Sequence, residues 1–122
     1  MADINYTITG QVQKGALSQS FAASGITADI ATAGVLSVTL NLGTAVTQIS
    51  TATLGSVGLA FARSLATETT HTVSFGRYSG GSLYETVRLK AGEAAVLRLA
   101  SGDYAASSAV AGTRLVLTVY ED

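Results

Sequence analysis

Few residues of this 122-residue chain could do chemistry. The one histidine, His71, follows the polar run of residues 66–70 at the expected start of a strand, so we expect it to be exposed or to cap a turn. The chain has no cysteine, which excludes a thiol nucleophile, a thiolate metal site and a disulfide. A Ser-His-Asp triad is assembled by folding, so sequence spacing leaves it open, but no Gly-x-Ser-x-Gly elbow supports one.

The carboxylates do not gather into a recognisable metal site. Their spacing never matches a calcium loop, and we expect them to be solvated. Phosphate-loop and dinucleotide-binding fingerprints are also absent from the sequence. We therefore expect no catalytic residue, no metal and no cofactor. The acidic residues considered are Asp3, Asp29, Glu85, Glu93, Asp103, Glu121 and Asp122.

The tyrosines and arginines could form a recognition surface, because both types are enriched at interface hot spots. Two of the tyrosines flank one expected turn, with arginines nearby. They could contact a partner subunit, stack on a sugar ring, or simply occupy outward positions on strands. The candidate interface residues are Arg77, Tyr78, Tyr84, Arg88 and Tyr120.

The composition points to a subunit that is buried in an assembly. Only 12% of the residues are charged and 48% are hydrophobic, whereas globular proteins average about 25% charged residues. A surface with few charges and few long side chains loses little free energy when it is desolvated and ordered against another protein. The net charge of −1 offers no basic patch for nucleic acid. The longest apolar runs, such as residues 57–62, are far too short for a membrane helix, so we expect neither nucleic acid nor membrane as a partner.

Period-two alternation of apolar and polar residues recurs along the chain and predicts an all-β fold. It is clearest in residues 4–9, 36–42, 57–65, 72–76 and 114–120. Glycine turn signals at about ten-residue spacing suit an antiparallel two-sheet β-sandwich with about eight strands. The expected turns include Gly10, Gly34, Gly43, Gly55, Gly80-Gly81, Gly92, Gly102 and Gly112.

Residues 83–100 allow a sharper prediction about a connection. The apolar positions keep odd parity across Ala91-Gly92: Leu83, Val87 and Leu89 precede this pair, and Ala95, Leu97 and Leu99 follow it. A two-residue hairpin would pair odd positions with even ones and bring Arg98 beside the inward residues. The unchanged parity fits either an odd-length loop with a bulge or an arch that carries the chain from one sheet to the other. We favour the arch, which predicts a two-sheet sandwich.

The N-terminal third is harder to interpret. No linker composition divides the chain, so we predict a single domain over residues 1–122, within which residues 1–13 or 1–33 could extend as a strand or arm. The alanine-rich residues 22–33 favour strand and irregular chain over helix. Residues 1–5 lack the features of a signal peptide, so we expect synthesis in a cytoplasm.

The stretch LYETVRLKAGEAAVLRLA at residues 83–100, preceded by FGRYSGG at residues 75–81 and followed by the strand to Tyr120, resembles small virion proteins of tailed bacteriophages. In these proteins a polar-turn hairpin leads into an LKAGE arch, a run of Leu and Ala, and a closing strand. The resemblance covers about residues 57–121. It implies a jelly-roll or related sandwich that binds capsid or tail surfaces in repeated copies, with no catalytic residues.

Composition and resemblance together predict a non-enzymatic head decoration or cement protein that resides in the virion. It would bind the major capsid protein or another virion protein, and would associate with itself, with a trimer favoured. A tail, baseplate or fibre component is the second hypothesis. A carbohydrate-binding module is the third, and an enzyme has the least support.

Overall fold

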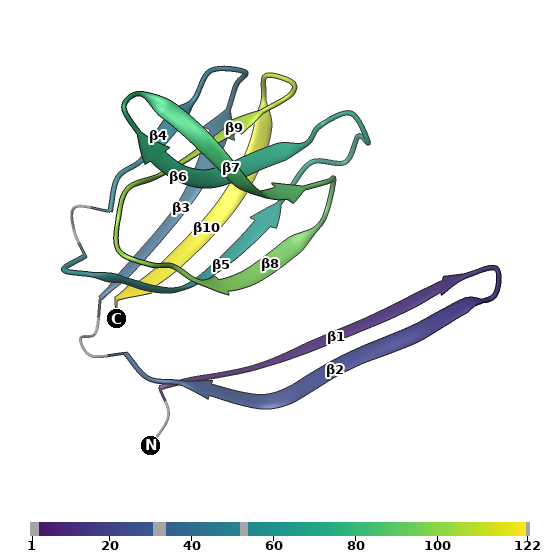
Figure 1. The fold of residues 1–122 in the computed structure, drawn as a ribbon. Helices are drawn as coiled ribbons and strands as arrows, with labels where there is room; N and C mark the ends of the chain where they lie inside the picture. The colour runs from purple at the N-terminus through teal and green to yellow at the C-terminus, as the bar shows by residue number, and fades with distance from the viewer. Residues whose placement is uncertain (1–2, 31–33, 52–53, 122) are drawn as a thin grey trace. The chain divides into compact units, whose positions relative to one another are not determined.

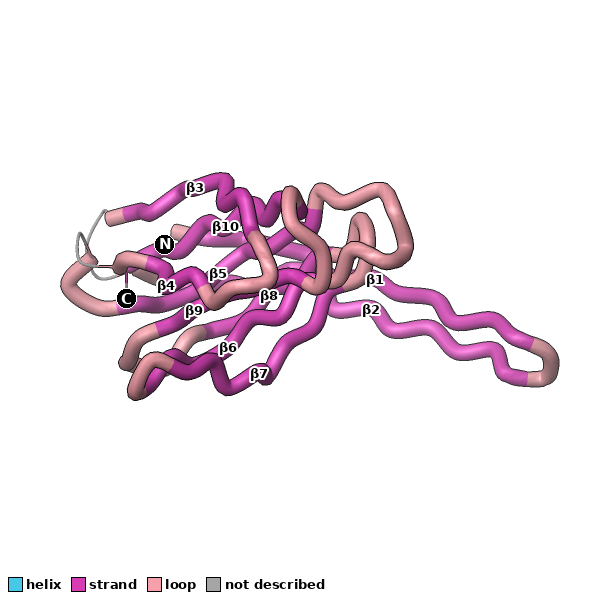
Figure 2. Tube along the Cα trace, turned by 90° about the horizontal axis from the view of Figure 1, so that it is seen from above, coloured by secondary structure: helices cyan, strands magenta, loops and turns pink. Residues whose placement is uncertain are grey.

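The computed structural model describes residues 3–30, 34–51 and 54–121. Within these residues the fold is all-β, with ten strands and no helix, and therefore no helix long enough to cross a membrane (Figure 2). Three parts of the sequence predictions lie outside the described residues: the first two residues, the end of the alanine-rich segment at 31–33, and the terminal carboxylate of Asp122. The strands are β1 (Ile4–Lys14), β2 (Leu17–Ala28), β3 (Val35–Leu42), β4 (Thr47–Ile49), β5 (Val57–Ser64), β6 (Val73–Ser79), β7 (Ser82–Leu89), β8 (Ala94–Arg98), β9 (Tyr104–Ser108) and β10 (Thr113–Glu121).

The chain divides into two compact units, Met1–Ala31 and Thr32–Asp122. The first unit is an antiparallel hairpin of β1 and β2 that turns at Gly15, whose φ of 58° lies in the left-handed region. The alanine-rich segment is extended up to Ala28 rather than helical, as predicted. Asp3 joins the two ends of the hairpin, because its carboxylate accepts a hydrogen bond from the Ile30 N–H at 3.1 Å.

The second unit is the predicted two-sheet sandwich. One sheet has the order β3-β10-β5-β8 and the other has the order β4-β9-β6-β7, and all pairings are antiparallel (Figure 1). Numbered within the sandwich alone, the eight strands run 1-8-3-6 and 2-7-4-5, which is the strand order of a jelly roll. The described residues form ten strands rather than the predicted eight, because the hairpin adds two strands to the eight of the sandwich.

The core between the sheets is built from alternate residues of the strands. In β10, Leu115, Leu117 and Val119 are almost completely buried, and their side chains face the other sheet. The neighbouring strand β5 turns its small residues inward, since Ala60 and Ala62 pair with Val119 and Leu117. The larger apolar residues of β5 at positions 59 and 61 therefore lie on the outer face of this sheet.

The arch predicted at Ala91-Gly92 is confirmed, because β7 belongs to one sheet and β8 to the other. Gly92 has a φ of 76°, which only glycine adopts readily. The Glu93 carboxylate accepts a hydrogen bond from the Lys90 N–H at 2.6 Å, and the Glu93 N–H donates to the Lys90 carbonyl at 3.1 Å. The arch is thus closed by two reciprocal hydrogen bonds of its own glutamate.

We predict that Glu93→Ala lowers the free energy of unfolding by about 1 kcal/mol, because it leaves the Lys90 N–H without its acceptor. Glu93→Gln keeps an oxygen acceptor of the same reach and should recover most of the loss. Chemical denaturation of the three proteins measures the difference. Equal losses for Ala and Gln would contradict the role of this hydrogen bond.

Two details of the sequence prediction are wrong. Gly10 is not at a turn but lies within β1, paired with Phe21, because its backbone is extended and the hairpin reverses five residues later at Gly15. Leu83 does not share the inward face of Val87. A β-bulge at Thr86 adds one residue between them, and a single extra residue moves the following side chains to the opposite face.

Candidate functional site

The five residues predicted to form an interface do not come together in one patch. Arg77 and Tyr78 lie on β6, and Tyr84 and Arg88 lie on the adjacent β7. Tyr120 lies on β10, in the other sheet of the sandwich. The structure thus places four of them around one hairpin and the fifth on a separate surface.

Within the β6–β7 hairpin the two tyrosines lie on opposite faces. The strands are joined by Gly80-Gly81, with φ values of 60° and 81°, which is the conformation of a two-residue type I′ turn. Tyr78 pairs with Leu83, whereas Tyr84 pairs with Arg77 in the next row of the ladder. Because successive rows point to alternate faces, one flat ligand cannot stack on both rings.

Arg77 packs against the end of the sandwich core. Its guanidinium lies 5.7 Å from the centroid of the Tyr104 ring, and that ring stacks on Phe75 with centroids also 5.7 Å apart and planes 7° from parallel. The Tyr104 hydroxyl donates a hydrogen bond to the Ala100 carbonyl at 2.5 Å. A Cβ added at Gly102 would collide with the Arg77 guanidinium. Arg77 therefore has a structural role in covering the Tyr104 ring.

Arg88 is held on the surface by an ion pair. Its Nη2 donates to Glu85 Oε1 at 2.8 Å. The pKa of Glu85 is lowered from its ordinary value, first by a hydrogen bond from the Ser74 side chain and then by Arg88. Both groups lie at the surface, where solvent and salt screen the pair, so its contribution to stability is small.

We predict a pH dependence that follows from the lowered pKa of Glu85. A carboxylate whose pKa is lower in the folded state stabilises the fold above its unfolded pKa, and this contribution is lost as the pH falls through the folded pKa. The difference in unfolding free energy between wild type and Glu85→Gln should therefore be largest near neutral pH and should shrink on acidification. Denaturation of both proteins across the acid range checks this, and a difference that grows on acidification would contradict it.

Tyr120 belongs to an apolar area on the outer face of the β3-β10-β5-β8 sheet. Its ring makes an edge-to-face contact with Phe61 of β5, with centroids 6.0 Å apart and planes at 90°. Beside Phe61, a shallow groove of about 170 Å³ lies along β5, β8 and β10 and is lined by Val96 and Val116 among others. Phe61 was not among the residues predicted from the sequence, although its alternation with Ala60 and Ala62 was the available signal. These residues give the outer face of a sheet an apolar character.

His71 takes part in a network of hydroxyl groups rather than in a reactive site. Its Nδ1 lies 3.3 Å from the Thr113 Oγ1, and its Nε2 lies 3.6 Å from the Glu68 Oε2. The order Thr-His-Glu is formally that of a catalytic triad. The Thr113 hydroxyl, however, is buried and donates to the Val110 carbonyl at 2.8 Å, while it accepts from Ser108 at 2.7 Å. A hydroxyl so enclosed has no room for a substrate, and the network fixes the turn between β9 and β10.

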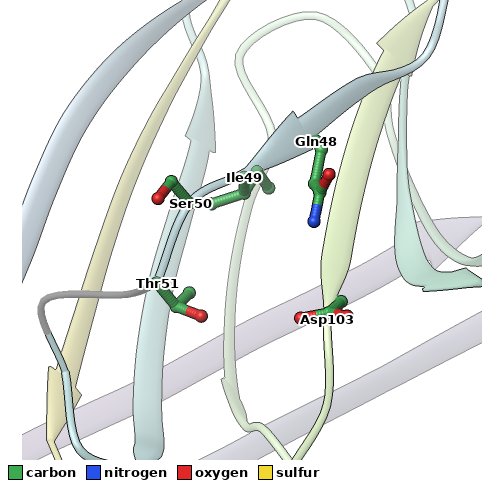
Figure 3. Close-up of a pocket in the computed structure, with 5 residues that line it drawn as sticks. All are labelled: Gln48, Ile49, Ser50, Thr51 and Asp103. Carbon is green, nitrogen blue, oxygen red and sulfur yellow. The ribbon is translucent and has the colours of Figure 1, made fainter.

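A hollow on the sandwich lies between the end of β4 and the start of β9 (Figure 3). It measures about 310 Å³ and is lined by Gln48, Ile49, Ser50, Thr51 and Asp103. Its single carboxylate, Asp103, cannot hold a metal ion alone. No group of three or more potential metal-ligating side chains occurs in the described part of the chain. The hollow is a polar surface depression with no reactive pair of groups.

The hairpin unit carries three exposed large apolar side chains, among them Phe21. Val12, Leu17 and Phe21 are 51%, 49% and 62% exposed, and their rows place all three on one face of the ribbon. This surface was not predicted from the sequence, where only tyrosines and arginines were interface candidates. The signal was present as the alternation of residues 4–14.

Neither models of protein families nor curated proteins nor solved structures give a match to this chain. The function therefore has to be argued from the surfaces and contacts described above. Within the described residues, these surfaces are an apolar outer sheet face on the sandwich and an apolar ribbon face on the hairpin unit.

Proposed function

We propose that this protein is a non-enzymatic structural subunit of a tailed-phage virion, a head decoration or cement protein that binds across capsid subunits as an oligomer, with a trimer favoured. The observation that carries the proposal is a jelly-roll sandwich with few charges, whose outer sheet face is apolar around Phe61. Jelly rolls recur in viral capsid proteins, but lectins have the same architecture. The choice between a virion protein and a carbohydrate-binding protein therefore depends on the chemistry of the surface.

The surface favours protein as the partner. Phe61, Val96 and Val116 are half-buried on the outside of a sheet, where a free monomer normally presents polar side chains. Covering these residues with another protein removes apolar area from water, which contributes about 25 cal/mol per Å². The chain as a whole has few charges, but Arg63 lines the same groove, so a partner there has to leave this guanidinium solvated or hydrogen-bonded.

The LKAGE segment that carries the phage resemblance stabilises the fold. Lys90 and Glu93 close the arch between the sheets, and the same glutamate offers its carbonyl to the Ser64 N–H at 2.9 Å. The segment therefore ties β5, β7 and β8 together. This supports a family in which the motif maintains a scaffold and the surrounding surfaces bind.

The mechanism would be purely associative. Each copy would contribute modest apolar and backbone contacts to the major capsid protein or to another virion protein. Many copies bound on one shell would act together through multivalency, so weak individual contacts could hold a pressurised head. The protein would be made in the host cytoplasm and would act in the assembled particle.

Depletion of the protein from particles tests this function. Particles without it should assemble but should lose their contents at a lower temperature and on milder osmotic shock, and adding the purified protein should restore both properties. Depleted particles as resistant as complete ones would overturn the cementing role. Labelled protein found on tails rather than heads would instead favour a tail, baseplate or fibre component.

A further inference from the structure

The charged side chains on the outer face of the β3-β10-β5-β8 sheet are all of one sign. The strand register aligns the outward residues of this sheet in rows across neighbouring strands (Figure 1). Among these described residues are three arginines, each of them exposed, and no carboxylate. The rows are Asn41-Arg114, Thr39-Val116-Arg63-Ala94, Ser37-Thr118-Phe61-Val96 and, at the far end, Val35-Tyr120 beside Leu59-Arg98.

Two of the arginines, Arg63 and Arg114, are diagonal neighbours on this face. Arg63 pairs with Val116, and Arg114 lies two residues before Val116 on the same strand. Diagonal positions on adjacent strands are about 7–8 Å apart, so the two guanidinium groups repel each other and can share one anion between them. Within the described residues, neither guanidinium has a hydrogen-bond or ion-pair partner.

The carboxylates that are closest to this pair along the chain have contacts of their own. Glu93 precedes β8, and its carboxylate accepts the hydrogen bond from the Lys90 N–H at 2.6 Å. Glu68 follows β5, and its Oε2 lies 3.6 Å from the Nε2 of His71. The arginine pair is therefore left to solvent or to an anion that a partner brings.

The groove beside Arg63 adds an apolar site. Phe61, Val96 and Val116 line this groove, and Arg63 lines it as well. Its volume is about 170 Å³, and a cavity of about 150 Å³ is large enough for benzene. The groove therefore has room for one large apolar side chain, which would lie directly beside a cation.

We propose that this face binds an acidic segment of a partner protein, with one apolar side chain in the groove and a carboxylate between Arg63 and Arg114. A guanidinium group is planar and binds a carboxylate through two parallel hydrogen bonds. A partner that covers the face also excludes water, which strengthens the attraction between the charges. The inference deepens the proposed function, and it rests on that function only for the identification of the partner as a virion protein.

Nucleic acid fits this face less well than an acidic protein does. Proteins that bind single strands stack the bases on exposed aromatic rings. Here Phe61 and Tyr120 pack against each other edge to face, and both are half-buried. The net charge of −1 also opposes the approach of a polyanion. The aliphatic walls of the groove instead suit an apolar side chain of a protein.

An NMR titration of the full chain tests the site with a defined probe. The probe is a blocked peptide with a central leucine and two aspartates on each side, and its control has asparagine in place of every aspartate. The acidic peptide should shift the methyl signals of Val96 and Val116. The control should bind about tenfold more weakly, because it loses the charge-assisted hydrogen bonds. Equal affinities, or no shift at these methyl groups with the acidic peptide, would overturn the proposal.

Two variants of equal net charge locate the bound carboxylate. Arg63→Gln should weaken binding of the acidic peptide about tenfold, because it removes one of the two guanidinium groups that hold the carboxylate. Arg88→Gln removes an arginine from the other sheet and should change the affinity by less than about twofold. Both arginines are exposed, and the unfolding temperature serves as the control for folding. Equal losses in the two variants would indicate general charge attraction and would contradict a site at Arg63.

A single-stranded oligothymidylate is the competing probe. If it shifts the same methyl signals at lower concentration than the acidic peptide does, the face binds nucleic acid and the proposal is wrong. The particle assays separate this inference from the proposed function. Peptide binding by a protein that does not protect particles would overturn the proposed function alone, whereas protection of particles without peptide binding would overturn only this inference.

Discussion

Gly76→Ala is expected to lower the free energy of unfolding by about 3 kcal/mol, at the upper end of the usual effect of overpacking. Gly76 lies in β6 opposite the β-bulge of β7, where the two strands come unusually close. A Cβ at this position would fall on the Tyr84 carbonyl oxygen and lie 3.0 Å from the Thr86 nitrogen. Both are backbone atoms, so no rotation of a side chain can relieve the collision, and the bulge itself has to open.

Gly43→Ala is the matched control. Gly43 has no positive φ, and a Cβ there would meet nothing within 4 Å. Its replacement should be neutral or slightly stabilising, because alanine reduces the freedom of the unfolded chain. Urea denaturation of both variants measures the contrast. Equal stability of the two would show that the bulge does not bring the strands as close as described.

Leu115→Ala is the second change with a large expected effect. Leu115 lies on the central strand β10, is 0% exposed, and belongs to the core between the two sheets. Removing its side chain should destabilise the sandwich by about 2–5 kcal/mol, through lost burial and the cavity left behind.

Val35→Ala provides the comparison on the neighbouring strand β3, since Val35 is 55% exposed. Its effect should stay within about 0.5 kcal/mol. Thermal or denaturant unfolding of both variants tests whether the core lies where the strand register places it. A larger effect at Val35 than at Leu115 would mean that the inner and outer faces of this sheet are assigned the wrong way round.

The sequence predicted the fold class well because alternation and parity are local signals. Period-two alternation identified the strands, and the unchanged parity of Leu89 and Leu97 across Gly92 favoured an arch between sheets over a bulged loop. That arch is where the sequence placed it. The pairing of β3 with β10, which closes the jelly roll, joins distant segments and left no local signal.

The faces of individual strands were harder to predict, because one residue can reverse them. The bulge at Thr86 turned Leu83 outward, although the sequence showed only an unbroken alternating strand. Tyr78 and Tyr84 lie on opposite faces because of the register that the two-residue turn at Gly80-Gly81 sets. In β5, the inward face holds the alanines because the large side chains of β10 already fill the space between the sheets. Such packing preferences depend on both partners and are not encoded in either strand alone.

The role of the few carboxylates was also outside the reach of sequence reasoning. We expected them to be solvated, but three accept hydrogen bonds from the backbone: Asp3 from Ile30, Glu93 from Lys90, and Glu121 from Gly55. In a chain with few charges, these groups secure the ends of strands and turns. Sequence spacing hints at this only for Glu93, which is three residues from its donor.

The central claim is that this chain functions as an assembling subunit, and its solution mass tests that claim most directly. Sedimentation or light scattering of the purified protein, from micromolar to millimolar concentration, should show a closed oligomer. A trimer is favoured. A single monomeric mass over the whole range would contradict the account.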